Sequence, residues 1–160
     1  MGHEFSGTVA EAPEGSPVAP GDAVAAFPLI PCGACAPCST GDYAQCADYD
    51  YYGSRRDGGF AEYVYMPAAN LFPGPAGVSL RSAAMTEPCA VALHGVEKFS
   101  LRAGMNALVL GGGPIGNMVA QWLKLKGCDP VYVADIDERK LALAEELGCV
   151  PLDSSACDPG

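Results

Sequence analysis

The chain has 160 residues, of which 49% are hydrophobic and 18% charged, and its net charge is −10. This composition is typical of a globular protein that buries a core without disulfides, and its acidity disfavours nucleic acid and anionic membranes as partners. No run approaches the ~18 apolar residues of a membrane-spanning helix. Eight cysteines without a secretory signal favour the reducing cytoplasm.

The first part of the chain, up to about residue 100, is rich in turns. Short β-type runs at 7–10, 23–27 and 61–65 are separated by clusters of Pro, Gly and Asp. The pattern predicts a small barrel-like or irregular antiparallel β domain. From residue 82 to about 97 the composition favours helix, and this stretch could bridge two domains.

The second part alternates strand-type and helix-type segments. Strands are predicted at 107–110, which reads as buried, and at 131–134 and 150–152, with amphipathic helices at 114–126 and 138–147. The apolar residues of the first helix fall on one face: Ile115, Met118, Val119, Trp122 and Leu125. Strand–helix–strand–helix–strand predicts half of a doubly wound parallel sheet.

Four cysteines follow the spacing C-x2-C-x2-C-x7-C: Cys32, Cys35, Cys38 and Cys46. Four soft ligands on a short, turning loop predict a tetrahedral structural zinc site, which is closed and performs no chemistry. An iron–sulfur cluster is an alternative, although the usual ferredoxin spacings do not match the seven-residue gap. Redox-active thiols are a second alternative, disfavoured because a dithiol switch needs only two cysteines. Most of the other cysteines are expected to be small buried hydrophobes: Cys89, Cys128, Cys149 and Cys157.

A glycine-rich loop follows the predicted strand at 107–110. Gly111, Gly113 and Gly116 fit G-x-G-x-x-G, in which the glycines permit a tight turn, approach of a pyrophosphate, and close packing of helix on strand. Asp135 ends the next strand, where a carboxylate would bind the ribose of NAD and repel the 2′-phosphate of NADP. The alternatives are a purely structural turn for the loop and a helix-capping or loop carboxylate for Asp135.

Two further places carry candidate ligands. His3 and Glu4 are adjacent, but such a pair lies more often on the surface or in packing than on a metal. Glu87 lies in a mostly apolar segment, where a buried carboxylate needs a partner such as a metal ion. His94 follows seven residues later, and we expect it to be a core histidine with satisfied hydrogen bonds.

Together these segments resemble the zinc-dependent medium-chain dehydrogenases. The matching pieces, in order, are GHEFSGTV, PGDAV, the four-cysteine run, GGFAEYV, TEPCAVALHGV and LGGGPIG followed by VADID. The glutamate of TEPCAVALHGV, where alcohol dehydrogenases proper tend to carry a cysteine, is similar to the polyol dehydrogenase branch. The implied fold is a partial GroES-like β domain over residues 1–100, with its zinc lobe at 32–46, followed by the first half of a Rossmann doubly wound parallel sheet over 101–160.

The resemblance implies a role for each matching residue. His3 and Glu87 would ligate a catalytic zinc, and Glu4 would contact that zinc or hold its water. The four cysteines would bind the structural zinc. The pyrophosphate of NAD would be held by Gly111, Gly113, Pro114, Ile115 and Gly116, and the adenosine ribose by Asp135 with help from Lys140.

The reaction that the resemblance implies is NAD-linked oxidation of a secondary alcohol on a polyol or polyol phosphate, of the galactitol 1-phosphate or sorbitol type. The catalytic zinc of such enzymes supplies Lewis-acid chemistry, and the parent enzyme is expected to be a homo-oligomer. Arg55 and Arg56 could attract a substrate phosphate, although a solvated pair of loop residues is the favoured interpretation. The alternatives are a non-catalytic truncated zinc module and a threonine dehydrogenase-like enzyme.

The chain departs from the family at both ends. The family's chain begins well before its GHE motif, in a segment that carries a cysteine ligand of the catalytic zinc and a hydroxyl residue of the proton relay. Here Met1 lies directly before this motif, and the chain stops after about half of the nucleotide sheet. We therefore expect an internal piece of a dehydrogenase, with a complete cysteine lobe and a catalytic zinc site that lacks one ligand.

Overall fold

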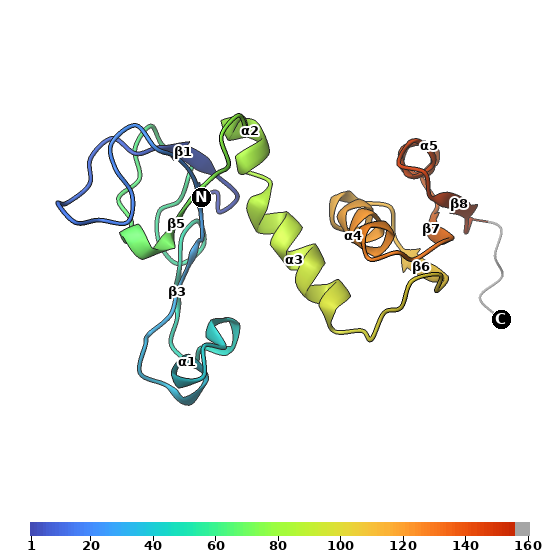
Figure 1. Cartoon of the computed structure of the whole chain (residues 1–160), viewed down its shortest axis with the longest axis horizontal. Coiled ribbons are helices and arrows are strands. Elements are labelled where there is room, and N and C mark those ends of the chain that lie inside the picture. Colours follow the sequence, from blue (N-terminus) through green and yellow to red (C-terminus); the bar gives the residue numbers. More distant parts are fainter. Residues whose placement is uncertain (156–160) are drawn as a thin grey trace. The chain divides into compact units, whose positions relative to one another are not determined.

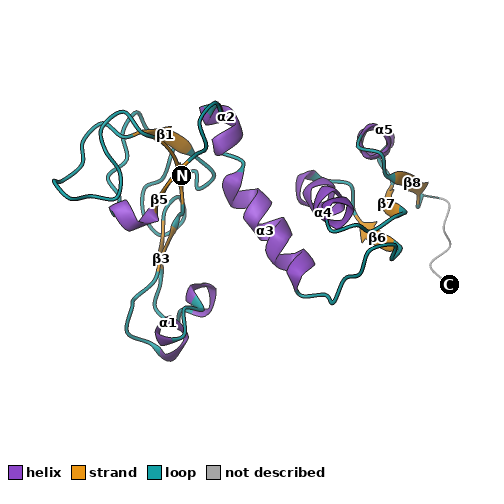
Figure 2. Cartoon of the chain, viewed as in Figure 1, coloured by secondary structure: helices purple, strands orange, loops and turns teal. Residues whose placement is uncertain are grey.

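The computed structural model describes residues 1–155, and its contacts divide the chain into two compact units, Met1–Glu87 and Pro88–Gly160. The first unit consists mainly of loops with short strands, whereas the second alternates strands and helices (Figures 1 and 2). The division into domains at residue 100 stays a prediction. Within the described residues, no helix is both long enough and apolar enough to cross a membrane.

A three-stranded antiparallel sheet organises the first unit. Strand β2 (Ala23–Ala26) lies in the middle and pairs with β1 (Ser6–Thr8) on one side and with β5 (Leu71–Pro73) on the other. A small core packs beside these strands, formed by Val9, Val18 and Val24. The strands predicted at 7–10 and 23–27 are therefore present, with bounds that differ by one or two residues.

The cysteine lobe connects the two strands of a second, two-stranded sheet. Strands β3 (Leu29–Ile30) and β4 (Asp50–Tyr51) pair antiparallel, and the chain between them forms helix α1 (Ala36–Ser39) and the 3-10 helix η1 (Tyr43–Gln45). Gly33 has a φ of +73°, which an L side chain rarely adopts, so this turn of the lobe requires glycine. The ladder therefore brings the two ends of the lobe together.

The strand predicted at 61–65 is not formed. A strand needs a neighbour that accepts and donates backbone hydrogen bonds, and none of the described strands pairs with this segment. The chain continues through the 3-10 helix η2 (Ala68–Asn70) into β5. The buried side chain of Asn70 donates to the carbonyls of Phe27 and Leu29, at 2.8 and 2.7 Å, and fixes η2 against the neighbouring chain.

The helical stretch predicted from residue 82 is two helices. Helix α2 (Leu80–Ala83) begins earlier than predicted because the Ser79 hydroxyl caps it by accepting from the N–H of Ser82 at 3.1 Å. Helix α3 (Thr86–Glu97) follows after a break of two residues. Glu87 lies in the first turn of α3, where a carboxylate is favoured by the helix dipole.

The second unit has a three-stranded parallel sheet in the order β6 (Ala107–Leu110), β7 (Val131–Asp135) and β8 (Val150–Asp153). Helix α4 (Pro114–Leu125) connects β6 to β7, and helix α5 (Glu138–Glu146) connects β7 to β8. All five elements were predicted with bounds correct to within one residue. An antiparallel β unit followed by the start of a parallel sheet confirms the predicted fold class.

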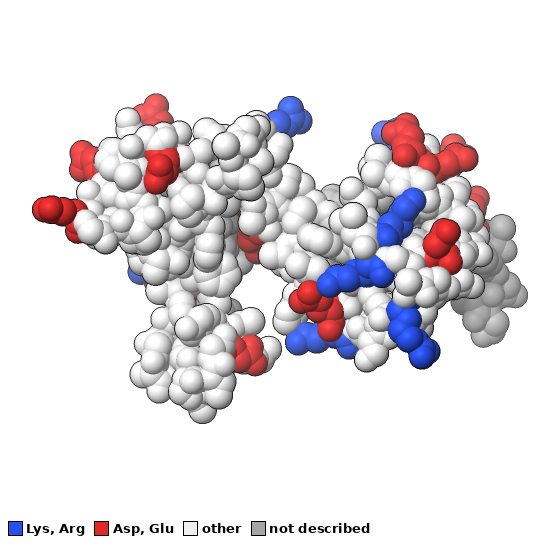
Figure 3. Space-filling view, in the orientation of Figure 1, with Lys and Arg blue, Asp and Glu red and all other residues white. Residues whose placement is uncertain are grey.

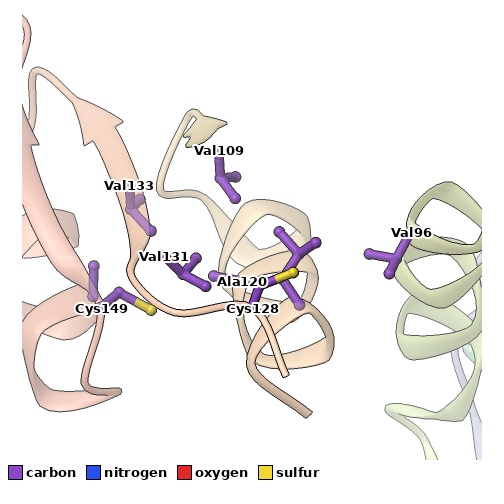
Figure 4. Packing of buried hydrophobic residues seen from close by; sticks show 9 residues of the cluster. Val96, Val109, Ala120, Cys128, Val131, Val133 and Cys149 are labelled. Carbon is purple, nitrogen blue, oxygen red and sulfur yellow. The ribbon is translucent and has the colours of Figure 1, made fainter. Parts of the chain in front are cut away.

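The core of the second unit lies between the sheet and its helices (Figure 4). Its most buried members include Ala120, Val133 and Ala144, whose exposed fractions are all 0%. The predicted apolar face of α4 is partly wrong, because Ile115 and Leu125 are exposed. The helix instead buries Asn117, Ala120 and Leu123.

The prediction that β6 is buried is also only partly correct. Val109 is buried, whereas Leu108 and Leu110 are 57% and 81% exposed. Right-handed crossovers place α4 and α5 on the same face of the sheet. Within the described residues of this unit, no helix therefore covers the other face of β6, and Leu108 and Leu110 are exposed there.

Candidate functional site

The structure brings the four predicted ligands of the lobe together. One Sγ atom from each of Cys32, Cys35, Cys38 and Cys46 lies within 4.8 Å of all the others. Three of the Sγ–Sγ separations are 3.4 Å for Cys35–Cys38, 3.9 Å for Cys35–Cys46 and 4.0 Å for Cys32–Cys38. Four thiolates around a tetrahedral zinc lie about 3.8 Å apart. The cluster therefore has the size and the donor set of a structural zinc site.

The surroundings of these thiols favour binding of a cation. The backbone N–H groups of Ala47 and Cys38 lower the pKa of Cys35 to about 6. Burial, together with the neighbouring thiol of Cys35, raises the pKa of Cys38 to about 12. Four adjacent sulfurs cannot all ionise without a compensating positive charge, and a divalent metal supplies that charge.

A second cluster of possible ligands joins the start of the chain to helix α3. One ligand atom from each of His3, Glu4 and Glu87 lies within 4.8 Å of the other two. His3 and Glu4 are exposed, and Glu87 is half-buried. One imidazole and two carboxylates form a donor set that zinc accepts, and exposure on one side leaves room for further ligands. This geometry fits an open metal site, in contrast to the closed cysteine lobe.

Tyr51 of β4 forms a wall of this second cluster and was not identified from the sequence. Its hydroxyl donates to Glu87 Oε1 at 3.2 Å, and its ring lies edge-on to the ring of His3, with centroids 5.7 Å apart. Burial and the charge of Glu87 raise the pKa of Tyr51 to about 12. Tyr51 therefore remains a neutral hydrogen-bond donor that orients the Glu87 carboxylate.

A glycine-rich loop holds the GHE segment in place. The N–H of Gly59 donates to the carbonyl of Gly2 at 2.8 Å. A Cβ atom on Gly58 would lie 2.0 Å from that carbonyl oxygen, and one on Gly53 would lie 2.5 Å from it. A side chain at position 53 or 58 would therefore clash with Gly2, the residue before His3. The glycines of the motif GGFAEYV and of the preceding turn could have suggested this close approach.

The predicted dinucleotide loop has the geometry that its glycines imply. Gly111 has a φ of +97°, and a Cβ on Gly116 would lie 1.8 Å from the Gly111 carbonyl oxygen. A Cβ on Gly113 would meet nothing within 4 Å. Pro114 is the first residue of α4, and Ile115 beside it is exposed. The loop therefore leaves open space at the N-terminus of α4, where a phosphate group fits.

Asp135 at the end of β7 is buried and bonded to the same loop. Its carboxylate accepts from the N–H groups of Gly112, Ile136 and Asp137 at 2.7, 2.8 and 2.9 Å. The ammonium group of Lys140 lies 3.3 Å from each of its oxygens. The N–H groups of Asp137 and Gly112 are the main reason that the pKa of Asp135 falls to about 2. Asp135 and Lys140 thus lie together beside the loop, and their role in ribose binding stays a prediction.

Gly112 of the loop and Asn117 of α4 are residues that sequence reasoning missed. The Gly112 N–H donates to Asp135, and its carbonyl accepts from Asn117 Nδ2 at 2.8 Å. Asn117 lies in the first turns of α4 and is only 6% exposed. The N–H and the carbonyl of Gly112 are therefore both held by side chains. A polar residue directly after the third glycine of the motif is the signal that could have identified Asn117.

Neither His94 nor any described cysteine outside the lobe is a member of the two clusters. His94 is exposed, so the expectation of a core histidine is wrong. The prediction of buried thiols is confirmed for Cys128 and Cys149, whereas Cys89 is half-buried. Cys157 lies outside the described residues.

Comparison with known proteins agrees with this geometry. Residues 1–76 match the model of the alcohol dehydrogenase GroES-like domain. The chain is 40% identical to galactitol 1-phosphate 5-dehydrogenase of Escherichia coli over 98% of its own length and 45% of that enzyme. It is 38% identical to L-threonine 3-dehydrogenase of Bacillus velezensis over 99% of its length and 46% of that enzyme.

A solved structure of a zinc-binding dehydrogenase from Sinorhizobium meliloti, bound to NADP, superposes with a TM-score of 0.94 and 39% identity, over 99% of this chain and 47% of that one. Residues 1–76 are thus similar to the alcohol dehydrogenase GroES-like domain, and the chain is similar in sequence and structure to zinc-binding dehydrogenases. The chain spans slightly less than half the length of these relatives.

Proposed function

We propose that the chain forms the metal-binding and first nucleotide-binding part of an NAD-linked dehydrogenase that oxidises a secondary alcohol of a polyol or polyol phosphate. The observation that carries the proposal is the convergence of His3, Glu4 and Glu87, from opposite ends of the first unit, within 4.8 Å. A closed cysteine lobe alone would indicate only a zinc site with a structural role. An open cluster beside it supplies a place for chemistry.

The residues of the open cluster have separate tasks. His3 and Glu87 would hold a zinc ion, and Glu4 would contact the ion or position a water molecule beside it. Tyr51 orients Glu87 through the hydrogen bond to Oε1. When bound, zinc supplies Lewis-acid chemistry that acidifies a substrate hydroxyl. In the lobe, the four cysteines would hold a structural zinc that fixes the loop between β3 and β4.

The coenzyme would bind at the loop after β6. Gly113 leaves open space, Pro114 and Ile115 begin the helix that faces the pyrophosphate, and the close contact of Gly116 with Gly111 shapes the turn. Asp135, assisted by Lys140, would accept hydrogen bonds from the adenosine ribose. The ionised Asp135 carboxylate would repel a 2′-phosphate, which favours NAD over NADP.

The test of this function is an NAD reduction assay on the chain with galactitol 1-phosphate and with sorbitol, followed at the absorbance of NADH. Reduction with either polyol supports the proposal, and no reduction with both polyols contradicts a dehydrogenase activity of this chain. Binding of NAD and of NADP, measured by calorimetry, tests the coenzyme site separately. Tighter binding of NADP than of NAD would contradict the role given to Asp135.

Threonine dehydrogenase activity is the second candidate, because L-threonine 3-dehydrogenases are among the similar proteins at 38–40% identity. The same assay with L-threonine distinguishes it. A non-catalytic zinc module is the candidate from another class, and it predicts one zinc per chain with no turnover. We also propose a functional division into residues 1–100 and 101–160, a cytoplasmic location and a homo-oligomeric parent enzyme.

A further inference from the structure

The loop beside the open cluster carries two of the three cations in the first unit. Residues 1–87 contain ten carboxylates but only three basic side chains, Arg55, Arg56 and Arg81. Among the charged side chains on the face of this unit visible in Figure 3, most are acidic. An anionic ligand would be repelled by most of this surface. The loop that contains Arg55 and Arg56 is therefore locally basic in an otherwise acidic unit.

The two arginines have different partners. Arg56 is neutralised by Asp50, since its Nε donates to Asp50 Oδ2 at 2.6 Å and its Nη2 lies 2.5 Å from the same oxygen. Arg55 has no ion-pair partner in residues 1–155. One of its N–H groups donates to the carbonyl of Tyr49, which leaves the other guanidinium N–H groups without a partner in the described chain.

Arg55 is also held in a fixed orientation. Its guanidinium lies 3.9 Å from the centroid of the Tyr49 ring, a cation–π contact that leaves the edge of the group free. The backbone N–H groups of Arg55 and Arg56 both donate to the carbonyl of Tyr51, at 3.0 and 3.2 Å, and this turn fixes the loop. A planar cation with free donors and little freedom is suited to bind a phosphate ester.

A continuous aromatic wall joins Arg55 to the open cluster. The ring of Tyr51 contacts the ring of His3 on one side and lies 6.3 Å, between centroids, from the ring of Tyr49 on the other. The guanidinium of Arg55 lies over the ring of Tyr49. A cavity of about 480 Å³ opens beside the arginine. Its lining residues are Met1, Gly53, Ser54, Arg55, Arg56 and Asp57.

We propose that Arg55 binds the phosphate of a polyol phosphate whose hydroxyl, several carbons away along the His3–Tyr51–Tyr49 wall, reaches the cluster of His3, Glu4 and Glu87. This inference rests on the proposed function and selects the phosphorylated substrate class within it. Arg56 serves a different purpose, because its ion pair with Asp50 only stabilises the loop. Asp57 lines the same cavity and opposes an anion there.

The test is calorimetric titration of the full chain with sorbitol 6-phosphate and with sorbitol, at low ionic strength. The unmodified chain is expected to bind the phosphate ester at least about tenfold more tightly than the polyol. Arg55→Gln should remove this preference, and Arg55→Lys should recover only part of it because lysine lacks the planar fork. Asp57→Asn should strengthen binding of the ester a few-fold. Arg81→Gln, which removes the same charge from exposed α2, is the matched control and should leave the preference intact.

A second arm separates the substrate phosphate from the phosphates of the coenzyme. Arg55→Gln should leave the affinity for ADP-ribose unchanged. An equal loss of affinity for sorbitol 6-phosphate and for ADP-ribose would overturn the proposal. Equal binding of ester and polyol by the unmodified chain, or an equal loss in Arg55→Gln and Arg81→Gln, would overturn it too. If the phosphate preference is present but NAD is not reduced with any polyol, the proposed dehydrogenase function fails while the phosphate site stands.

Discussion

The two candidate metal clusters differ in how much of the fold each one needs. The cysteine lobe takes all its ligands from one short segment between β3 and β4, so local turns and the ladder beneath suffice to assemble it. The second cluster joins the start of the chain to the first turn of α3, and it exists only when the first unit is folded. The lobe can therefore support the fold, whereas the second cluster depends on it.

The largest expected effect comes from breaking the lobe. Cys38→Ser removes one of four thiolates, and we expect loss of the lobe's zinc and destabilisation of the first unit by about 3 kcal/mol or more, since structural zinc binding contributes directly to folding. Metal analysis and thermal unfolding measure both effects. Cys89→Ser, in the second unit, is the control, and equal metal loss in both variants would contradict the assignment.

The glycine loop offers the next largest effect. Gly116→Ala places a Cβ at 1.8 Å from the Gly111 carbonyl oxygen, so we expect destabilisation of about 3 kcal/mol in urea unfolding. Gly113→Ala places its Cβ in open space and should cost less than about 1 kcal/mol. We expect both variants to lose affinity for ADP-ribose, but only the first to lose stability. Equal stability of the two variants would show that the loop geometry is wrong.

Asp135 links stability to pH. Its folded pKa of about 2 lies below the ordinary value of 3.8, so its contribution is complete above pH 3.8 and is lost as the pH falls towards 2. In Asp135→Asn, the free energy of unfolding should therefore depend less on pH between pH 2 and pH 3.8. Denaturant unfolding across that range measures the change. Glu146→Gln, an exposed neutralisation on α5, should leave the profile unchanged, and a parallel change in it would contradict the role of Asp135.

The smallest effect on stability is expected from the open cluster. Glu87→Gln replaces a half-buried carboxylate with an amide of the same shape whose oxygen can still accept from Tyr51, so the free energy of unfolding should change by less than about 1 kcal/mol. The affinity for a second zinc should nevertheless fall at least about tenfold, measured by competition with a chelator. His94→Ala changes an exposed histidine on the same helix and should leave this affinity intact. A loss of zinc in His94→Ala alone would refute the ligand set.

Periodicity and local turn chemistry account for the parts of the fold that were predictable from the sequence. The elements of the second unit have strong patterns and local ends, such as the Asp137 side chain that caps α5 by accepting from the N–H of Arg139. The segment 61–65 has a strand-type pattern, yet a strand also needs a partner, which a pattern cannot supply. The exposure of Leu108 and Leu110 likewise depends on which elements cover the sheet.

The candidate site was predictable to different degrees for the same reason. Four cysteines in one run specify a lobe by spacing alone. The pairing of His3 with Glu87 came from a family resemblance, because no spacing rule connects residues at the two ends of a unit. Tyr51, Gly58 and Asn117 escaped notice, since their importance arises from contacts that only the folded chain creates.

Zinc content per chain is the most direct test of the account. The purified chain, loaded with zinc and freed of excess metal, should contain two zinc ions per chain by mass spectrometry. A mild chelator should remove the ion at His3, Glu4 and Glu87 first, because the cysteine lobe offers four thiolates in a closed site. One zinc per chain, held by the lobe alone, would contradict the claim that the open cluster is a metal centre.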